Sequence, residues 1–285
     1  MITLGINAVF HDSAAALVRD GVLVAAAEEE RFTRIKHAKR PVPFAAWELP
    51  FHAIDYCLQV ASITLADVDH VAYSYDPYQL LPAGADRIEL PIEPSATARS
   101  DPHTSQWDPL FLAYIVNAPR QLAGGAPHHL GARLRATALR YRWHFVDHHL
   151  AHEASAFLPS PYREAAILTM DGRGERTTTS YARGSGARME RLRAIELPNS
   201  LGLLYEEVTR HLGFLHSSDE YKVMALASYG NPRYAATFRR ILSIDGEGSY
   251  RVAPADLSEY FGPARERGAP FTTEHFDIAS SLQQV

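Results

Sequence analysis

The chain has 285 residues, 46% of them hydrophobic and 21% charged, the balance of a soluble globular protein with one large domain or two modest ones. Its formal net charge of −5 argues against a nucleic-acid surface, and no apolar run approaches the roughly 20 residues needed to cross a membrane. The single cysteine, Cys57, excludes an internal disulfide, and the strand-like N-terminus does not resemble a signal peptide. We therefore expect a cytoplasmic protein.

The first residues predict a three-stranded antiparallel meander. Apolar runs at 2–9, 14–19 and 22–28 have the length of strands. The polar residues His11-Asp12-Ser13 separate the first two runs, and Asp20-Gly21 is a hairpin signal between the last two.

The next part of the chain predicts helices joined by short strands and one long loop. Helical spacing of apolar residues predicts helices over 44–60, 110–123 and 129–141, with Gly124-Gly125 as a break, and apolar runs predict strands over 69–75 and 143–146. Cys57 falls among the apolar positions of the first helix, so we expect it in the core. Segment 77–109 lacks periodicity and is rich in Pro, Ser and Asp, which predicts a loop or lid.

After residue 160 the opening pattern returns. Strands are predicted over 165–170, 177–182 and 189–197, helices over 200–213 and 219–227, loop and short strand up to 268, and an amphipathic helix from 276. Ser200 is a plausible N-cap and Gly213 a plausible end for the first of these helices. The last helix is cut off at residue 285, so we expect the sequence to be part of a longer one.

Both halves thus open with strand, Asp-bearing turn, strand, Gly turn and strand. Such duplication is typical of the actin-like α/β fold (ASKHA, ribonuclease-H-like), in which two Asp-bearing turns face one nucleotide phosphate chain. We expect subdomain 1 over about 1–160 and subdomain 2 over about 161–285, its second half incomplete at the C-terminus.

A candidate metal site follows from two histidines and an aspartate. His148 and His152 are four residues apart, so on a helix their imidazoles project from one face, as two neighbouring ligands of a metal ion do. Asp171 lies where an apolar strand meets a glycine turn and could complete a set of mixed nitrogen and oxygen ligands. Histidines at this spacing also occur on helix surfaces and in cores, and Asp-Gly is ordinary turn chemistry, so the pattern alone leaves both interpretations open.

Several of these motifs resemble one enzyme family, the O-carbamoyltransferases of nodulation-factor and antibiotic biosynthesis. The matching blocks occur in one order between residues 2 and 230: 10–15, 28–37, 147–152, 171–175, 200–205 and 220–230. Segment 77–125 carries no recognised motif and is our candidate for acceptor specificity.

The resemblance implies an actin-like N-terminal domain, similar to the tRNA threonylcarbamoyl-transferring enzyme, followed by a C-terminal YrdC-like domain. The latter would make carbamoyl-adenylate from carbamoyl phosphate and ATP with Mg²⁺, and the former would move the carbamoyl group onto a hydroxylated small molecule. The family's divalent metal, Fe²⁺ or else Mn²⁺ or Zn²⁺, would be held by His148, His152 and Asp171. A further aspartate ligand and the YrdC-like domain are absent from this chain, so we expect the latter in cis or in trans.

Candidate roles can be assigned on this basis. His11 is our candidate general base, because imidazole titrates near neutral pH, and Asp12 would orient it or the acceptor. The candidate contacts to the nucleotide or the carbamoyl group are Arg34, Lys36, Gly172, Gly174, Gly202, Glu220 and Lys222. The plainer interpretation of His11 is a histidine that only caps a turn. For Arg34 and Lys36 it is a solvated run of charges.

Two other functions remain open at this stage. One is an ATP-dependent small-molecule kinase of the actin-like superfamily, which the His148 and His152 pair disfavours, because phosphoryl transfer uses magnesium held by carboxylates. The other is a non-catalytic nucleotide-binding module. The sequence names neither the acceptor nor the oligomeric state.

Overall fold

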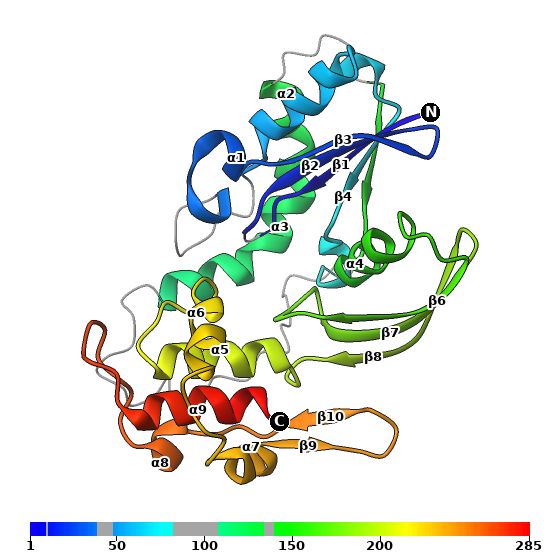
Figure 1. Cartoon of the computed structure of the whole chain (residues 1–285). Coiled ribbons are helices and arrows are strands. Elements are labelled where there is room, and N and C mark those ends of the chain that lie inside the picture. The colour runs from blue at the N-terminus through cyan, green and yellow to red at the C-terminus, as the bar shows by residue number, and fades with distance from the viewer. Residues whose placement is uncertain (10, 39–47, 82–107, 134–139) are drawn as a thin grey trace. The chain divides into compact units, whose positions relative to one another are not determined.

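The computed structural model describes residues 1–9, 11–38, 48–81, 108–133 and 140–285 (Figure 1). The chain divides into two compact units, Met1–Leu90 with Ser105–Ala151 and Pro91–Thr104 with His152–Val285, which we call unit 1 and unit 2. Both mix helices with β-sheet, as expected for an α/β protein. No helix among the described residues is apolar for long enough to cross a bilayer.

Unit 1 contains a five-stranded sheet in the order β3-β2-β1-β4-β5. Its strands are β1 (Ile2–Asn7), β2 (Ala14–Arg19), β3 (Val22–Glu28), β4 (His70–Tyr73) and β5 (Arg142–Phe145). The first three form the predicted antiparallel meander, whereas β4 pairs in parallel with β1 and with β5. Asp20 and Gly21 both have positive φ, 51° and 82°, as a tight two-residue hairpin requires.

The helices of unit 1 differ from the sequence prediction at two places. They are α1 (Glu30–Thr33), α2 (Phe51–Val60) and α3 (Asp108–Arg133), with short 3₁₀ turns at Lys36–Ala38, Leu65–Asp67 and Pro77–Gln79. Helix α2 does not begin at residue 44, because residues 48–50 are non-helical and Pro50 is its N-cap, while residues 44–47 lie outside the described part. Most of the predicted loop 77–109 lies outside it as well.

Helix α3 continues through Gly124-Gly125, where a break was predicted. Residues 134–139 of the predicted second helix lie outside the described part of the chain, and residues 140 and 141 are not helical. Each glycine costs a helix about 1 kcal/mol relative to alanine. Burying a leucine side chain returns about 1.5–3 kcal/mol, and Leu122 and Leu130 are fully buried on one face of α3. Tertiary packing therefore outweighs the glycine pair.

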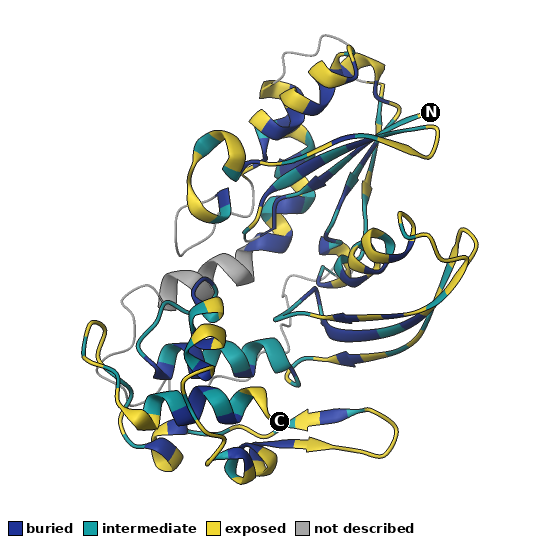
Figure 2. Cartoon of the chain, in the orientation of Figure 1, coloured by how far each residue is buried: buried dark blue, intermediate teal, exposed yellow. Residues whose placement is uncertain are grey.

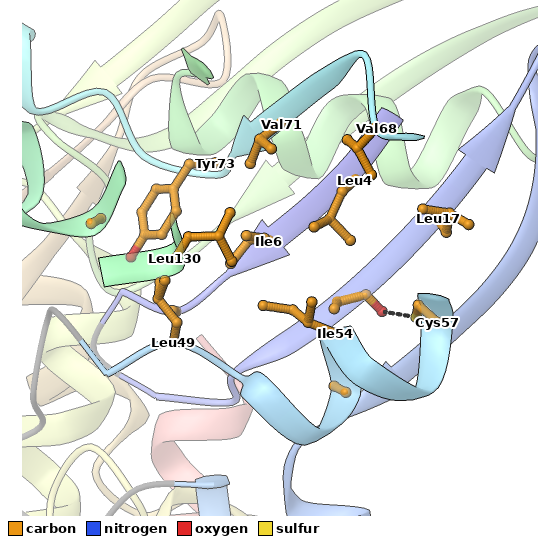
Figure 3. Close-up of a cluster of buried hydrophobic side chains, with 14 of the residues drawn as sticks. Leu4, Ile6, Leu17, Leu49, Ile54, Cys57, Val68, Val71, Tyr73 and Leu130 are labelled. Carbon is orange, nitrogen blue, oxygen red and sulfur yellow. Dashed lines mark hydrogen bonds between the residues drawn. The ribbon is translucent and has the colours of Figure 1, made fainter. Parts of the chain in front are cut away.

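The core of unit 1 lies between the sheet and helices α2 and α3. Figure 3 shows Leu4 and Ile6 of β1 meeting Ile54 of α2 and Leu130 of α3. Cys57 is buried in the same cluster, as predicted, and its thiol donates to the carbonyl of Ala15. Buried positions alternate along β1, β2 and β4 and line one side of α2 (Figure 2).

Unit 2 has a three-stranded antiparallel sheet in the order β6-β7-β8 and a separate hairpin. The strands are β6 (Glu164–Met170), β7 (Thr177–Ser185), β8 (Arg188–Glu196), β9 (Leu242–Ile244) and β10 (Tyr250–Val252). The helices are α4 (His148–Phe157), within which the division of the chain falls, α5 (Leu201–His211), α6 (Glu220–Ala227), α7 (Ala235–Ile241), α8 (Leu257–Phe261) and α9 (Thr273–Gln283).

Helices α7 and α8 lie where loop and short strand were predicted. They span seven and five residues, too few for a periodic pattern to emerge from the sequence. Tertiary contacts hold them in place: Phe238, Ile241 and Phe261 are buried in one cluster with residues of α5, α6 and α9. A second, smaller core joins Phe157 of α4 to the β6-β7-β8 sheet.

Candidate functional site

Polar residues gather where the parallel strands of unit 1 end. Because Ile6 of β1 pairs with Tyr73 of β4, and Tyr73 pairs with Phe145 of β5, the carboxyl ends of these strands meet at one edge of the sheet. This edge is where ligands commonly bind in α/β folds. It carries Asn7, Ser74 and His148, each at or shortly after the end of its strand.

A chain of hydrogen bonds runs along this edge. The Nδ1–H of His148 donates to the Ser74 carbonyl at 3.1 Å, and the Ser74 hydroxyl donates to Asn7 Oδ1 at 2.6 Å. Asn7 Nδ2 in turn donates to the carbonyl of Asp12 at 2.9 Å. The predicted metal ligand His148 and the turn that carries His11 and Asp12 are therefore joined within unit 1.

The three predicted metal ligands come together. His148, His152 and Asp171 each offer one ligand atom, and these atoms lie within 4.8 Å of one another. The one-turn spacing of helix α4 places His148 beside His152, and His152 Nε2 lies 3.4 Å from Asp171 Oδ2. The His148 bond to Ser74 fixes its tautomer, so that its Nε2 carries the lone pair a metal needs.

Asp171 is positioned by the turn that follows β6. Its backbone N–H donates to the backbone carbonyl of Thr178 at 2.9 Å, and its Oδ1 accepts the N–H of Gly172 at 2.6 Å. The N-terminus of α5 packs on this turn without room for a side chain: a Cβ on Gly202 would lie 2.6 Å from the Cα of Gly172. The hydroxyl of Ser200, the N-cap of α5, donates to the Gly172 carbonyl at 2.7 Å.

Helix α4 is anchored to the sheet that ends in Asp171. Glu153, directly after His152, is only 1% exposed and accepts hydrogen bonds from Ser180 of β7 at 2.7 Å and Arg191 of β8 at 2.8 Å. The Phe157 ring packs so closely on Gly184 of β7 that a Cβ there would lie 2.6 Å from it. These contacts fix His152 relative to the strands of unit 2.

His11 and Asp12 form a second polar group, which also includes His37. The Nδ1 atoms of His11 and His37 lie 2.7 and 2.8 Å from the two carboxylate oxygens of Asp12. The bond with His11, and then that with His37, lower the pKa of Asp12 to about 2, although its burial opposes this. Asp12 is therefore ionised near neutral pH, and both imidazoles donate their Nδ1–H to it.

The predicted nucleotide or carbamoyl contacts fall in both units. In unit 1, Arg34 ends α1 with positive φ and Lys36 begins the next 3₁₀ turn, both exposed. In unit 2, Gly172 and Gly202 are in backbone contact. Gly174 closes the same turn by donating its N–H to Thr177 at 2.8 Å.

Lys222 and Glu220 lie at the start of α6 in different surroundings. The Lys222 ammonium pairs with Asp219 at 2.9 Å, which offsets its position near the positive end of the helix. Burial, with the nearby charge of Glu206, raises the pKa of Glu220, whose Oε1 is buried with no hydrogen-bond partner among the described residues.

Sequence reasoning missed Glu206 of α5. Its Oε2 accepts a hydrogen bond from Ser217 at 2.8 Å and lies 4.0 Å from Arg173 of the Asp171 turn. Burial alone would raise its pKa, but His216 and Arg173 lower it on balance. Glu206 and Glu220 thus differ in protonation tendency, an arrangement common at functional sites.

His37, Asn7 and Ser74 were missed as well. His37 lies beside Lys36 in the charged run, where nothing distinguishes it from a solvated residue. Asn7 and Ser74 are 67 residues apart, and only the parallel pairing of β1 with β4 brings them into contact. In the sequence, Asn7 and Ser74 are marked only by their position near the ends of predicted strands.

Comparison with known proteins identifies the family. Residues 2–80 and 122–262 match the family described as "Carbamoyltransferase N-terminus". An uncharacterized Synechocystis protein, sll1178, is 37% identical over 300 residues, covering 99% of this chain and 46% of that protein. Nodulation protein NolNO of Sinorhizobium fredii is 36% identical over 287 residues, covering 98% of this chain and 37% of that protein.

Nodulation protein NolO of Bradyrhizobium diazoefficiens is 38% identical over 148 residues, 49% of this chain and 26% of that protein. YeaZ from Pseudomonas aeruginosa is a remote structural likeness, with a TM-score of 0.34 and 16% identity over 70% of this chain and 67% of that one. The matched region spans less than half the length of each of these three curated relatives. It belongs to the carbamoyltransferase family and corresponds to that family's N-terminal part.

Proposed function

We propose that this chain transfers a carbamoyl group from carbamoyl-adenylate to a hydroxyl of a sugar or natural-product acceptor. The observation that carries the proposal is the hydrogen-bonded path from His148 through Ser74 and Asn7 to Asp12. It holds a candidate metal ligand and a candidate base on one edge of one sheet. An electrophile and an acceptor hydroxyl bound at that edge would meet both groups.

The donor atoms suit a divalent transition metal. Ligand atoms of a tetrahedral ion at about 2.0–2.1 Å lie about 3.3 Å apart. His152 Nε2 and Asp171 Oδ2 are separated by 3.4 Å, longer than most hydrogen bonds of charged groups and close to that spacing. Two imidazoles and one carboxylate favour Fe²⁺, Mn²⁺ or Zn²⁺ over Mg²⁺. Such an ion would act as a Lewis acid toward the carbamoyl or phosphate oxygen.

The proposed proton acceptor is His11. Because its Nδ1–H is donated to Asp12, the lone pair lies on Nε2, which can accept the proton of the attacking hydroxyl. As the bond between the acceptor oxygen and the carbamoyl carbon forms, the bond from that carbon to the phosphate oxygen breaks. AMP leaves, and the proton moves to His11 Nε2.

The remaining parts of the proposal concern the whole protein. We infer that the two units are the halves of a duplicated actin-like fold, because each opens with the same three-stranded meander. Carbamoyl-adenylate would come from carbamoyl phosphate and ATP with Mg²⁺ on a YrdC-like domain, in cis or in trans. Arg34, Lys36 and Gly174 would contact the phosphate or carbamoyl group.

The test compares two histidine variants of the whole natural polypeptide that carries this chain. His148→Ala should lose bound metal in elemental analysis and reduce carbamoyl transfer by roughly 1,000-fold, while circular dichroism stays unchanged. His144→Ala is the matched control, because His144 is exposed on β5 and the side-chain hydrogen bond that its imidazole makes is with His70, at 2.9 Å.

Undiminished carbamoyl transfer by His148→Ala would refute the metal assignment. A magnesium-dependent phosphorylated product would instead indicate a kinase of the actin-like superfamily. Nucleotide binding without turnover of any acceptor would indicate a binding module.

A further inference from the structure

His37 lies on the same carboxylate as the proposed base. Its Nδ1 is 2.8 Å from Asp12 Oδ1, while His11 Nδ1 is 2.7 Å from Asp12 Oδ2. We propose that His37 is a positioning residue that fixes the Asp12 carboxylate and thereby holds His11 in the tautomer with its lone pair on Nε2. This inference rests on the proposed function, in which His11 accepts the acceptor's proton.

The distances favour hydrogen bonds over a second cation site. His11, Asp12 and His37 are chemically able to hold a metal ion. Their nitrogen-to-oxygen separations of 2.7 and 2.8 Å, however, are those of charge-assisted hydrogen bonds. They are well below the 3.4 Å between His152 and Asp171. An Nδ1 that donates its proton to a carboxylate has no lone pair to offer a metal.

The backbone ties His37 to Asp12 independently of the side chains. The N–H of Asp12 donates to the carbonyl of His37 at 2.9 Å, and the N–H of His37 donates to Glu30 Oε2 at 2.8 Å. Both residues adopt the left-handed conformation, with φ of 54° at Asp12 and 61° at His37. Neither is glycine, so the surrounding fold must hold this unfavourable geometry.

The two imidazoles differ in exposure in a way that suits different tasks. The His11 side chain is 42% exposed and can reach a substrate, whereas that of His37 is 19% exposed. With Oδ1 bound to His37, the Asp12 carboxylate cannot rotate away from His11 without breaking a bond. Loss of His37 would leave that rotation free and weaken the tautomer preference of His11.

Three substitutions at one position separate the side chain from the backbone. His37→Asn keeps an N–H donor near the place of Nδ1 and tolerates positive φ. His37→Gly tolerates the same φ but removes the donor. His37→Ala removes the donor and adds backbone strain. Comparison of the Asn and Gly variants therefore isolates the bond to Asp12.

Two readouts apply to these variants. The ¹⁵N imidazole spectrum of the chain, with the His11 signal assigned by His11→Gln, reports which nitrogen carries the proton. We expect the Nδ1–H tautomer in the wild type and His37→Asn, and a mixture of tautomers in His37→Gly. Transfer by the whole natural polypeptide should fall roughly 10- to 100-fold in kcat for His37→Gly with little change in KM, and His37→Asn should recover most of it.

An unchanged His11 tautomer in His37→Gly would overturn the proposal, as would equal losses of kcat in the Asn and Gly variants. A second equivalent of Zn²⁺ bound by the wild type and lost in His37→Gly would also overturn it, in favour of a cation site. If the wild type transfers no carbamoyl group but the tautomer still responds to His37→Gly, the positioning role stands and the proposed function fails.

Discussion

The first turn of each sheet occupies the same place in its meander and carries different chemistry. In unit 1 the turn between β1 and β2 holds Asp12, whose oxygens accept hydrogen bonds at 2.7 and 2.8 Å from two imidazoles. In unit 2 the turn between β6 and β7 begins with Asp171, which lies 3.4 Å from His152 Nε2. One carboxylate is spaced to accept hydrogen bonds from its neighbours, and the other has the spacing that we propose for a metal ligand.

The two turns are also supported differently. Side-chain hydrogen bonds from Asn7 and His37 hold the turn of unit 1. Close backbone packing of Gly202 on Gly172 holds the turn of unit 2, with one side-chain hydrogen bond from Ser200 beside it. We therefore expect the first to be sensitive to loss of polar groups and the second to added volume.

Gly202→Ala should have the largest effect. Its Cβ would lie 2.6 Å from the Cα and N of Gly172 and 2.9 Å from the carbonyl carbon of Asp171, and none of these backbone atoms can move aside cheaply. We expect a loss of about 3 kcal/mol or more in the free energy of unfolding. Metal affinity should fall at least roughly tenfold, because Asp171 is displaced.

Gly5→Ala in β1 is the control for Gly202→Ala. Among the described residues, its Cβ would meet only the Ala16 carbonyl oxygen at 3.7 Å, an ordinary contact. Urea denaturation and chelator competition measure both variants. Similar behaviour of the two would show that the turn of unit 2 is not held by packing.

Arg191→Met tests how helix α4 is held on the sheet of unit 2. The variant would leave the 1%-exposed Glu153 without its 2.8 Å ion pair. Breaking a buried pair typically costs about 3–5 kcal/mol, and we expect about 2 kcal/mol because Arg191 itself is 28% exposed. Weaker metal binding should accompany the loss, because His152 precedes Glu153 on the helix.

Arg183→Met provides the matched comparison in the same sheet. Arg183 and Glu164 are 62% and 65% exposed in their ion pair, so its loss should change the free energy of unfolding by less than about 0.5 kcal/mol. Urea denaturation of both variants measures the difference. Equal costs would mean that Glu153 does not anchor α4.

Acidification should loosen unit 2 before unit 1. Burial, followed by the charges of His275 and Arg210, lowers the pKa of His211 in α5 from 6.5 to about 4. The unfolded chain then binds more protons between these values, so stability is full above pH 6.5 and falls as the pH drops toward 4. The free energy of unfolding falls by at most about 1.4 kcal/mol per pH unit. By pH 5 we expect a total loss of about 1.5 kcal/mol, after allowance for relaxation.

The corresponding contribution of Asp12 in unit 1 has a different window. Its pKa is lowered from 3.8 to about 2, so its stabilisation is present above 3.8 and is lost only as the pH falls toward 2. Hydrogen exchange at pH 7 and pH 5 can follow α5 and α2 separately. His211→Gln should flatten the response of α5, and a response unchanged by that variant would contradict the assignment.

Local regularity explains which features the sequence could predict. The meanders, the capped start of α5 at Ser200 and the pairing of His148 with His152 depend on short-range spacing, and Asp171 was marked by the end of a predicted strand. Whether that group binds a metal stays a prediction. The Asp12 contact with His37 could not be read from spacing, because it joins residues 25 apart through two left-handed conformations. The unbroken α3 depends on buried leucines that outweigh a glycine pair.

Ser200→Ala should have the smallest effect and divides the support of the Asp171 turn into two parts. The Ser200 hydroxyl caps α5 by accepting the N–H of Leu203 at 3.0 Å and donates to the Gly172 carbonyl at 2.7 Å. Its removal should cost about 1 kcal/mol in the free energy of unfolding, measured by urea denaturation. Asp256→Ala, at the half-buried N-cap of α8, should cost about the same without touching the turn.

Metal affinity distinguishes these two cap variants, because only Ser200 bonds to the turn. We expect metal affinity to fall roughly twofold to fivefold in Ser200→Ala, as the loss of one neutral hydrogen bond to the turn would produce. In Asp256→Ala we expect metal affinity to stay unchanged. If Ser200→Ala retains full affinity while Gly202→Ala does not, backbone packing alone positions Asp171. The contrast with the hydrogen-bonded turn of unit 1 would then be sharper than the distances indicate.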